Sequence, residues 1–240
     1  MGLKALNERF NRWHKCSLCE QNYHGVVMCA LGWACWKTYL GRPEGDLARC
    51  LSMEQLGNGL SDVRRYEDAL SMYQAALDAG RRYGSPEEDI QCCLINIARC
   101  YAKMGRLDDT IAIEREVYAR QKVLLGTSAV NTLTTGLNLV FSLIELEHYV
   151  EAKALGRELI PRGRHALGPE HDITLAIKEN YALALYSDPA ASREDIAKAT
   201  SALEDTTRIR SRVLGTHHPH TQTPLAALEG ARMRSEDVAT

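Results

Sequence analysis

Cysteine and histidine side chains gather near the start of the chain in a spacing that suits a metal ion. Cys16, Cys19, His24 and Cys29 follow the pattern C-x2-C-x4-H-x4-C. Zinc takes four such thiolate and imidazole ligands in a tetrahedron, and a CxxC pair can present two thiolates to one ion from a tight turn. The spacing therefore raises the hypothesis of an N-terminal zinc-dependent interaction module.

The residues between these ligands argue against that hypothesis. A zinc knuckle usually carries glycine after the second cysteine and just before the histidine, where this chain has Glu20 and Tyr23. The repeat pattern described below also runs through the segment as helix–turn–helix. Within a continuous helix His24 and Cys29, five residues apart, would point to different faces. Buried or incidental thiols are the favoured interpretation, and no metal or cofactor is expected.

Other reactive side chains form no catalytic pattern. Three histidines lie close to Pro219 in the sequence, namely His217, His218 and His220. A His-Pro pair marks a turn and the start of a helix more often than it marks a metal site. The sequence has no Gly-rich phosphate loop, no HExxH and no GxSxG elbow. We therefore expect that the protein is not an enzyme.

The composition is that of an ordinary globular protein. The 240 residues are 45% hydrophobic and 25% charged, with a net charge of −2. No single-sign field of the kind that binds nucleic acid is expected from such a balance. Arg208, Arg210 and Arg212 form a basic cluster, but Glu204 and Asp205 lie close by, so this cluster is interpreted as a solvated helix face.

Targeting and membrane signals are weak. Residues 1–15 contain no apolar signal core, and the apolar run at 25–36 is too short to span a bilayer and is followed by Lys37. We therefore expect no membrane partner and a cytoplasmic protein with reduced thiols.

Three asparagines mark a repeat. Asn96, Asn138 and Asn180 lie 42 residues apart and occupy the same place in a recurring pattern of two helical stretches. A period of about 40 residues with two helices per unit indicates a solenoid, in which each unit buries its apolar face against its neighbours. Small or medium residues open the second helix of each unit, at positions 69, 110, 152 and 199.

The best-defined repeat predicts the local structure of the others. Leu94, Ile97, Ala98 and Tyr101 recur at i, i+3, i+4 and i+7, which places them on one face of a first helix. A turn at 105–106 follows, where glycine gives the backbone freedom that a helix end needs. The second helix is predicted to run from about 107 to 125.

The pattern extends to both ends of the chain. Val26, Ala30 and Trp33 match the second-helix face, and residues 10–17 weakly match a first helix before it. Pro224 suits the start of a capping helix that runs to about residue 234. The predicted divisions are a degenerate, Cys-rich repeat at 1–49, four repeats at 50–215, and a capping helix and tail at 216–240.

The repeats resemble tetratricopeptide repeats, and their loops narrow the resemblance to the kinesin-light-chain type. The segment 214–221 reads LGTHHPHT, and 167–174 (LGPEHDIT) and 125–132 (LGTSAVNT) are looser copies of the same loop. The resemblance implies an all-α, right-handed α-solenoid of about five helix–turn–helix repeats with a C-terminal capping helix. It also implies a concave groove lined by the first helices, which binds a peptide or protein.

The implied function is a protein–protein interaction scaffold or adaptor that binds a peptide segment. The alternative is a cargo adaptor like the kinesin light chains themselves. Those proteins bind their motor through a heptad-repeat coiled coil, and no sustained heptad stretch occurs in this sequence. The sequence therefore favours a general adaptor over motor association.

Amide side chains are the first candidates for the groove. Asn96, Asn138 and Asn180, with Gln55 one repeat earlier, lie one turn away from the packing faces. An amide offers both an acceptor and donors, so a row of them can pair with the main chain of an extended peptide. In the alternative interpretation each amide bonds the neighbouring helix and locks the stack.

Neighbouring side chains would then select the ligand. Arg99 and Lys103 lie one helical turn apart and could clamp an acidic side chain or a terminal carboxylate. Phe141 and Tyr186 could accept an apolar anchor. An ordinary solvated pair remains the alternative for the two cations.

Overall fold

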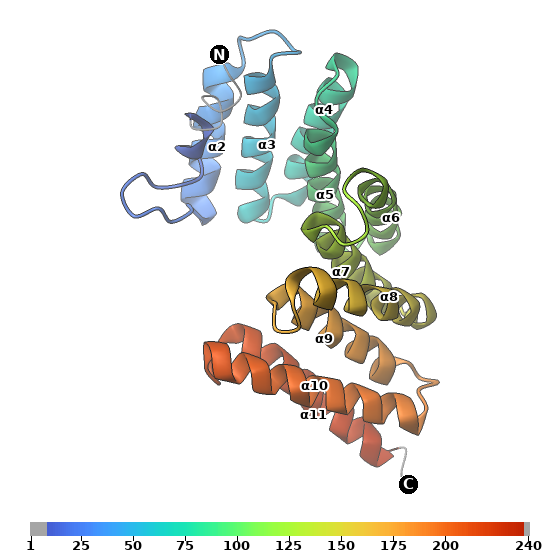
Figure 1. The fold of residues 1–240 in the computed structure, drawn as a ribbon. Helices are drawn as coiled ribbons and strands as arrows, with labels where there is room; N and C mark the ends of the chain where they lie inside the picture. The colour runs from blue at the N-terminus through green and yellow to red at the C-terminus, as the bar shows by residue number, and fades with distance from the viewer. Residues whose placement is uncertain (1–8, 238–240) are drawn as a thin grey trace. The chain divides into compact units, whose positions relative to one another are not determined.

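The computed structural model describes residues 9–237, and helices dominate this part of the chain (Figure 1). The helices are α2 (Gly25–Tyr39), α3 (Leu47–Asp62), α4 (Tyr66–Tyr83), α5 (Glu87–Lys103), α6 (Leu107–Leu124), α7 (Val130–Glu145), α8 (Tyr149–Leu167), α9 (Asp172–Ser187), α10 (Arg193–Leu214) and α11 (Pro219–Asp237). An isolated bridge pairs Lys15 with Asn22. The predicted fold class, an all-α solenoid of helix–turn–helix repeats with a C-terminal cap, is confirmed.

The chain divides into two compact units, residues 1–113 and 114–240. In the first unit each helix from α2 to α5 packs against the next one along the chain. The apolar face of α3, which has the same i, i+3, i+4 and i+7 spacing as the best-defined repeat, is buried there at Met53, Leu56, Gly57 and Leu60. This confirms that the 3.6-residue periodicity identified the packing face.

The second unit repeats the arrangement from α7 to α11. Consecutive helices pack together, and α7 also contacts α9, as α9 contacts α11. Contact between alternate helices is expected where first helices of successive repeats stack. Leu139, Val140 and Leu143 of α7, which follow the face of the best-defined repeat by 42 residues, are buried, and so are Ala199 and Leu203 of α10.

A left-handed residue follows the first helix in three repeats. Gly105 has a φ of 75°, and the equivalent Arg64 and Glu147 have φ values of 63° and 59°. The predicted turn at Gly105 is therefore confirmed, and the same turn forms elsewhere without glycine. A side chain with a Cβ is strained in this region by roughly 1–2 kcal/mol.

Loop histidines start two helices. Nδ1 of His171 accepts a hydrogen bond from the backbone N–H of Ile173 at 3.2 Å, and Nδ1 of His218 accepts one from His220 N–H at 3.2 Å. The first of these residues is the N-cap of α9. These contacts satisfy backbone donors that have no partner at a helix start, as the turn and helix-start interpretation of the second loop predicted.

The predicted first helix of the N-terminal repeat is wrong. A short helical stretch at residues 9–11 gives way to turns, and residues 14–23 form a hairpin held by Tyr23 N–H donating to the His14 carbonyl at 2.8 Å. Phe10 is nevertheless buried, with its ring stacked on Tyr39 of α2 at 5.1 Å between centroids. A small apolar cluster of Phe10 with Cys35, Tyr39 and Ala48 thus takes the place of the long apolar face of a complete helix.

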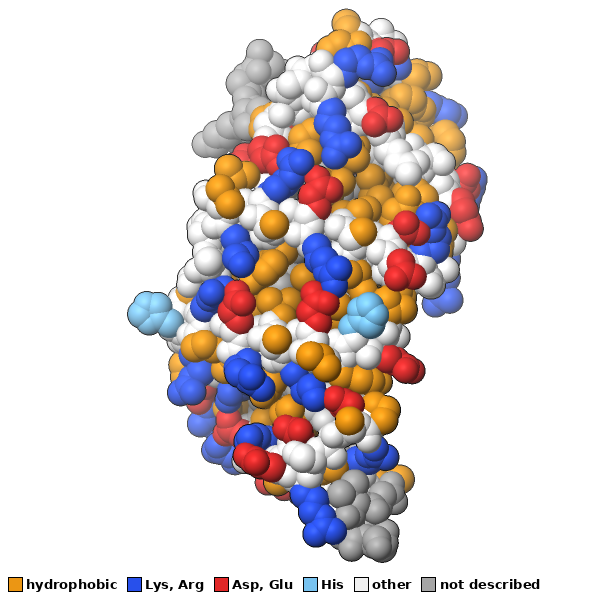
Figure 2. Space-filling model, turned by 90° about the vertical axis from the view of Figure 1, so that its right-hand side faces the viewer, with side chains coloured by type: hydrophobic (Ala, Val, Ile, Leu, Met, Phe, Trp, Pro, Cys, Tyr) orange, Lys and Arg blue, Asp and Glu red, His pale blue; other side chains and the backbone are white. Residues whose placement is uncertain are grey.

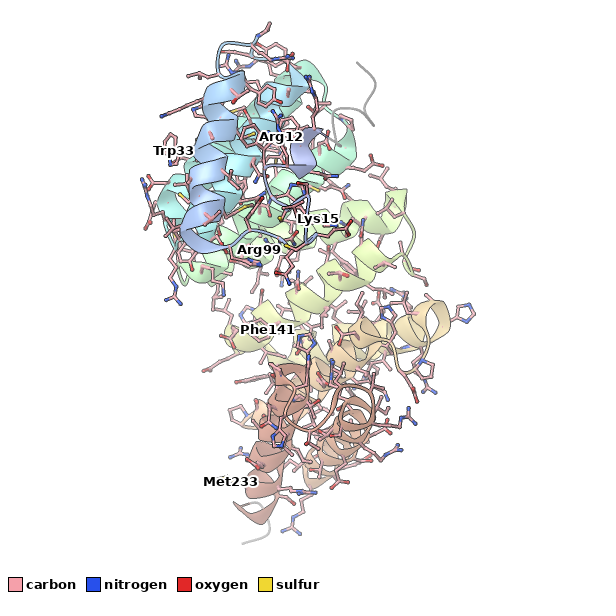
Figure 3. All side chains as sticks on the ribbon, turned by 90° about the vertical axis from the view of Figure 1, so that its left-hand side faces the viewer. Arg12, Lys15, Trp33, Arg99, Phe141 and Met233 are labelled. Atoms are coloured by element: carbon pink, nitrogen blue, oxygen red, sulfur yellow. The ribbon has the colours of Figure 1, made fainter. Side chains whose placement is uncertain are left out.

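The predicted packing face of α2 is also wrong. Val26 is 78% exposed and Trp33 is 41% exposed, and Figure 3 shows Trp33 projecting outward. Gly32, Cys35 and Tyr39 are buried instead. Because α2 is apolar on all sides, its hydrophobic pattern does not single out one face.

The packing of α2 on α3 is set by glycine. A Cβ added at Gly59 would lie 2.7 Å from the Cα of Cys29, and one at Gly32 would lie 3.0 Å from the Gln55 carbonyl oxygen. Backbone therefore meets backbone on both sides of this interface. The close approach explains why Gly32, rather than a larger apolar residue, faces the core.

Two corrections concern the C-terminal unit. The capping helix α11 begins at Pro219, not at Pro224, which lies inside it. Arg210 is 4% exposed and pairs with carboxylates of α9, so the interpretation of the whole basic cluster as solvated is wrong for this residue. Arg208 and Arg212 do lie at the surface.

None of the described helices combines the length and apolar character needed to cross a membrane.

Candidate peptide-binding pocket

A pocket of about 670 Å³ lies within the first unit. The N-terminal hairpin and the start of α2 form one wall, and α3, α4 and α5 form the rest. Side chains that can donate or accept hydrogen bonds make up most of this lining. They are His14, Asn22, Tyr23, His24, Gln55, Asn58, Ser61, Asp62, Arg64, Tyr66, Tyr73, Arg99 and Lys103, with Met28 as an apolar neighbour.

The lining carries more positive than negative charge. Arg64, Arg99 and Lys103 face one carboxylate, that of Asp62, among the described residues around the pocket. That carboxylate already accepts a hydrogen bond from the backbone N–H of Gly25 at the start of α2. The pocket is therefore suited to an anionic group.

Two of the three cations have no anionic partner among the described residues. Within residues 9–237, neither Arg99 nor Lys103 forms an ion pair or side-chain hydrogen bond. In the view of Figure 3 the hairpin that carries Lys15 lies over the part of α5 that carries Arg99. A carboxylate entering the pocket would meet two donors spaced one helical turn apart, and charge-assisted hydrogen bonds of this kind are about twice as strong as neutral ones.

Two uncharged side chains that are hydrogen-bonded to each other form part of the pocket wall. The hydroxyl of Tyr73 donates to Oδ1 of Asn58 at 2.7 Å. Tyr73 is 2% exposed, and burial raises the pKa of its hydroxyl well above the usual value. Since Oδ1 of Asn58 is occupied, the amide N–H groups of that residue remain available to donate to a ligand carbonyl.

Gln55 has a partner inside the chain. Its Nε2 donates to the backbone carbonyl of Trp13 at 3.0 Å, and its side chain is buried. The amide thus holds the segment that leads into the hairpin. Gln55 shapes the pocket wall, and its predicted contact with a ligand stays a prediction.

The three asparagines have no such partner. Asn96 and Asn180 are half-buried and Asn138 is exposed. Among the described residues none of these amides bonds a neighbouring helix. The stack-locking interpretation therefore has no contact to support it. The ligand role stays a prediction, and Asn96 does not line the pocket.

The two predicted aromatic anchors lie in the second unit and differ from one another. Phe141 is 47% exposed on α7 and is labelled in Figure 3. Tyr186 instead packs against a cluster that includes Leu228 and Ala231 of α11. The Phe141 side chain is therefore accessible to a partner, whereas the Tyr186 side chain packs against the capping helix α11.

The candidate zinc ligands are not assembled in this structure. Cys16 and Cys19 lie in one turn of the hairpin, which backbone hydrogen bonds of Cys16 with Gln21 and Glu20 close. His24 lines the pocket, and the backbone of Cys29 lies against Gly59. No group of three or more His, Cys, Asp or Glu side chains within residues 9–237 is placed to hold a metal ion.

The sequence analysis did not predict several of the residues that line the pocket. His14, Tyr23 and His24 belong to a segment expected to be helical, and Arg64 sits at the left-handed turn after α3. The deviation of the hairpin from the repeat pattern was visible only as a weak match at residues 10–17. Asn58 and Asp62, by contrast, follow from the same helical spacing that placed Gln55 on α3.

Charges elsewhere on the molecule are mixed. Figure 2 shows Lys and Arg side chains interspersed with Asp and Glu over the face that it presents. Ion pairs also join side chains of different helices, as Arg115 of α6 does with Glu151 of α8 and Arg232 of α11 with Glu204 of α10. This face has no extended region of one sign.

Comparisons with known proteins agree with this architecture. The tetratricopeptide-repeat family profile matches residues 48–122. No curated protein matches the chain in sequence. Among solved structures, a kinesin light chain of Podosopora anserina with nearly identical TPR-like repeats is similar with a TM-score of 0.65 at 16% identity, covering 78% of this chain and 87% of that one.

Two further structures are similar at low identity. BtubC (BKLC) from P. vanneervenii has a TM-score of 0.64 at 14% identity, with 88% of this chain and 91% of that chain covered. A Rap protein complexed with competence and sporulation factor has a TM-score of 0.56 at 13% identity, with 88% and 59% covered. At such identities the likeness concerns the fold.

Proposed function

We propose that this chain, which has the fold of kinesin-light-chain-type tetratricopeptide repeats, binds an acidic peptide segment in the pocket of its first unit. Tetratricopeptide repeats form protein-interaction scaffolds. The observation that carries the finer proposal is the pair Arg99 and Lys103, which face the pocket without a carboxylate partner.

The chemistry of the pocket supports this class of ligand. A carboxylate is satisfied by the two cations, and the free amide of Asn58 can donate to a peptide carbonyl. The pocket is open and polar, which suits part of a longer chain better than a small apolar molecule. The Rap structure of similar fold also contains a bound factor.

A cargo-adaptor role is the second interpretation that the sequence raised. The likeness to kinesin-light-chain-type structures concerns the fold, and it gives that role no further support. We also propose that the protein is not an enzyme, since the pocket residues are explained by binding.

The proposal is tested by selecting peptides from a displayed random library on the full chain. The best binder is then compared with its own variant in which each Glu and Asp is replaced by Gln and Asn, and with its C-terminal amide. We expect binders rich in acidic residues, or dependent on a free carboxylate. Neutralising the essential carboxylate should weaken binding roughly 10- to 100-fold, because a charge-assisted hydrogen bond contributes about 1.5–3 kcal/mol.

A matched pair of variants locates the site. Arg99→Ala with Lys103→Ala should weaken the same peptide to a similar extent. Lys37→Ala with Arg81→Ala removes the same charge from exposed positions of the first unit outside the pocket, and it should leave affinity nearly unchanged. Equal losses in both double variants would mean non-specific attraction, and binders without acidic groups would contradict the proposal.

A further inference from the structure

Cys16 and Cys19 lie in a turn at the end of the N-terminal hairpin, and backbone hydrogen bonds close this turn. Cys16 N–H donates to the Gln21 carbonyl at 2.9 Å, and Glu20 N–H donates back to the Cys16 carbonyl at 3.0 Å. Glu20 takes a left-handed φ of 58° as the chain reverses. These contacts close residues 16–21 into one tight turn, which carries both cysteines.

The surroundings of Cys16 favour its thiolate. The backbone N–H groups of Cys19 and Leu18, the thiol of Cys19 and the hydroxyl of Tyr23 each lower the pKa of the Cys16 thiol. Hydrogen bonds to a sulfur favour its thiolate form, and the thiolate is the nucleophile in thiol chemistry. The N–H of Cys19, followed by that of Leu18, lowers the pKa of the Cys16 thiol to about 7.

The other cysteines differ in burial. Cys35, Cys50, Cys93 and Cys100 are buried in helix interfaces, whereas Cys19 is exposed and Cys16 is half-buried. Burial raises the pKa of Cys35 to about 12 and that of Cys100 to about 11. Cys29 is half-buried and Cys92 is exposed as well, so what distinguishes Cys16 and Cys19 is that two accessible thiols share one turn.

From this geometry we infer that Cys16 and Cys19 form a thiol–disulfide exchange site, which closes reversibly to an intramolecular disulfide with a low-molecular-weight disulfide as oxidant. The described residues supply no third and fourth ligand beside the two thiols. A tetrahedral zinc site would need both, whereas a disulfide needs the pair alone.

The reaction proceeds in two displacement steps. The Cys16 thiolate attacks one sulfur of oxidised glutathione, breaks its S–S bond and releases one glutathione thiolate. The Cys19 thiolate then attacks the Cys16 sulfur of the mixed disulfide and releases the second glutathione. Two electrons pass from the protein to the glutathione disulfide, and the two protons of the cysteines end on the released thiols.

The test uses the full chain, stripped of metal by a chelator and treated with oxidised glutathione at pH 7. Intact-mass measurement and peptide mapping should show the loss of two hydrogens in the peptide that holds Cys16 and Cys19, reversed by dithiothreitol. Cys19→Ser should stop at the first step, with one glutathione on Cys16. Cys92→Ser is the matched control, because Cys92 is also exposed, and it should react like the wild type.

Rates give a second readout. Desolvation raises the pKa of Cys92, so Cys16 should form its adduct at least roughly fivefold faster at pH 7, after the lower nucleophilicity of a low-pKa thiolate is included. A pair that stays reduced while a control dithiol in the same solution is oxidised would overturn the inference. So would one equivalent of zinc bound by the untreated protein and lost in both Cys16→Ser and Cys19→Ser.

Discussion

The guanidinium of Arg210 on α10 is buried against the carboxylate of Glu179 on α9. Its Nε donates to Oε1 at 2.7 Å and its NH2 group donates to Oε2 at 3.3 Å. Asp172, at the start of α9, accepts a further hydrogen bond from the same guanidinium. Burial raises the pKa of Glu179, and Arg210 opposes that shift. The bidentate pair joins two helices of the C-terminal unit.

Removal of Arg210 should strongly destabilise that unit. In Arg210→Ala the carboxylate of Glu179 stays buried without its partner, and breaking such a pair costs about 3–5 kcal/mol. The measurement is urea unfolding followed by circular dichroism. Arg208→Ala, which removes an exposed partner of Asp205, should cost no more than about 1 kcal/mol. Equal effects of the two substitutions would show that burial of Arg210 contributes little.

The pH dependence of stability should report on Glu54. Burial raises the pKa of this carboxyl to about 7 from its ordinary value of 4.5. Between these pH values the folded chain holds the proton more tightly than the unfolded chain, so this group loses stability as pH rises from about 4.5 to 7. The loss is at most about 3 kcal/mol. Glu54→Gln cannot ionise, and its urea midpoint should fall less than that of the wild type between pH 5 and pH 8.

A second buried carboxyl, that of Glu114, also has a raised pKa. Burial raises the pKa of Glu114 to about 7 as well, so Glu54→Gln should remove only part of the wild-type pH dependence. The double variant with Glu114→Gln should flatten the curve further. Parallel curves for wild type and both variants would show that neither carboxyl is protonated in the folded chain near neutral pH.

Addition of one methyl group should disturb the interface of α2 with α3. In Gly59→Ala the new Cβ meets backbone atoms of Met28 and Cys29, which a rotamer change cannot move. Overpacking of this kind costs about 1–3 kcal/mol. Gly41→Ala adds the same group where nothing lies within 4 Å, and its thermal midpoint should match that of the wild type. A stable Gly59→Ala would mean that α2 can shift without loss.

The asparagine ladder makes a separate prediction. Because the side chains of Asn96, Asn138 and Asn180 have no described partner in the fold, single substitutions to Ala should leave thermal stability within about 0.5 kcal/mol of the wild type. If the amides hold a ligand main chain, each change should weaken a selected peptide severalfold. Lower stability with unchanged binding would assign the amides to the fold instead.

Much of the repeat architecture could be predicted from the chain. The 42-residue spacing of the asparagines and the small residues at Ala69, Ala152 and Ala199 gave the helix pairs and their buried faces. This works because each repeat buries a stripe only against its neighbours, so local periodicity carries most of the packing information. The prediction for α2 was wrong for the same reason. This helix is apolar on all sides, so its periodicity does not define one buried stripe.

The site was harder to predict than the fold. Helical spacing placed Gln55, Arg99 and Lys103 on the walls of what proved to be a pocket. It could not place His14 and Tyr23, because a hairpin closed by backbone hydrogen bonds leaves little trace in hydrophobic periodicity.

The amino-acid sequence alone determined the helical period, the buried faces of α3, α5, α7 and α10 and the types of polar residue between them. Only the tertiary structure decided which polar groups meet. Arg210 lies between Arg208 and Arg212 in sequence, and its burial depends on the carboxylates that α9 places opposite α10. Local patterns record which surface of a helix is apolar, whereas charge pairing depends on distances between segments, and those are fixed only by folding.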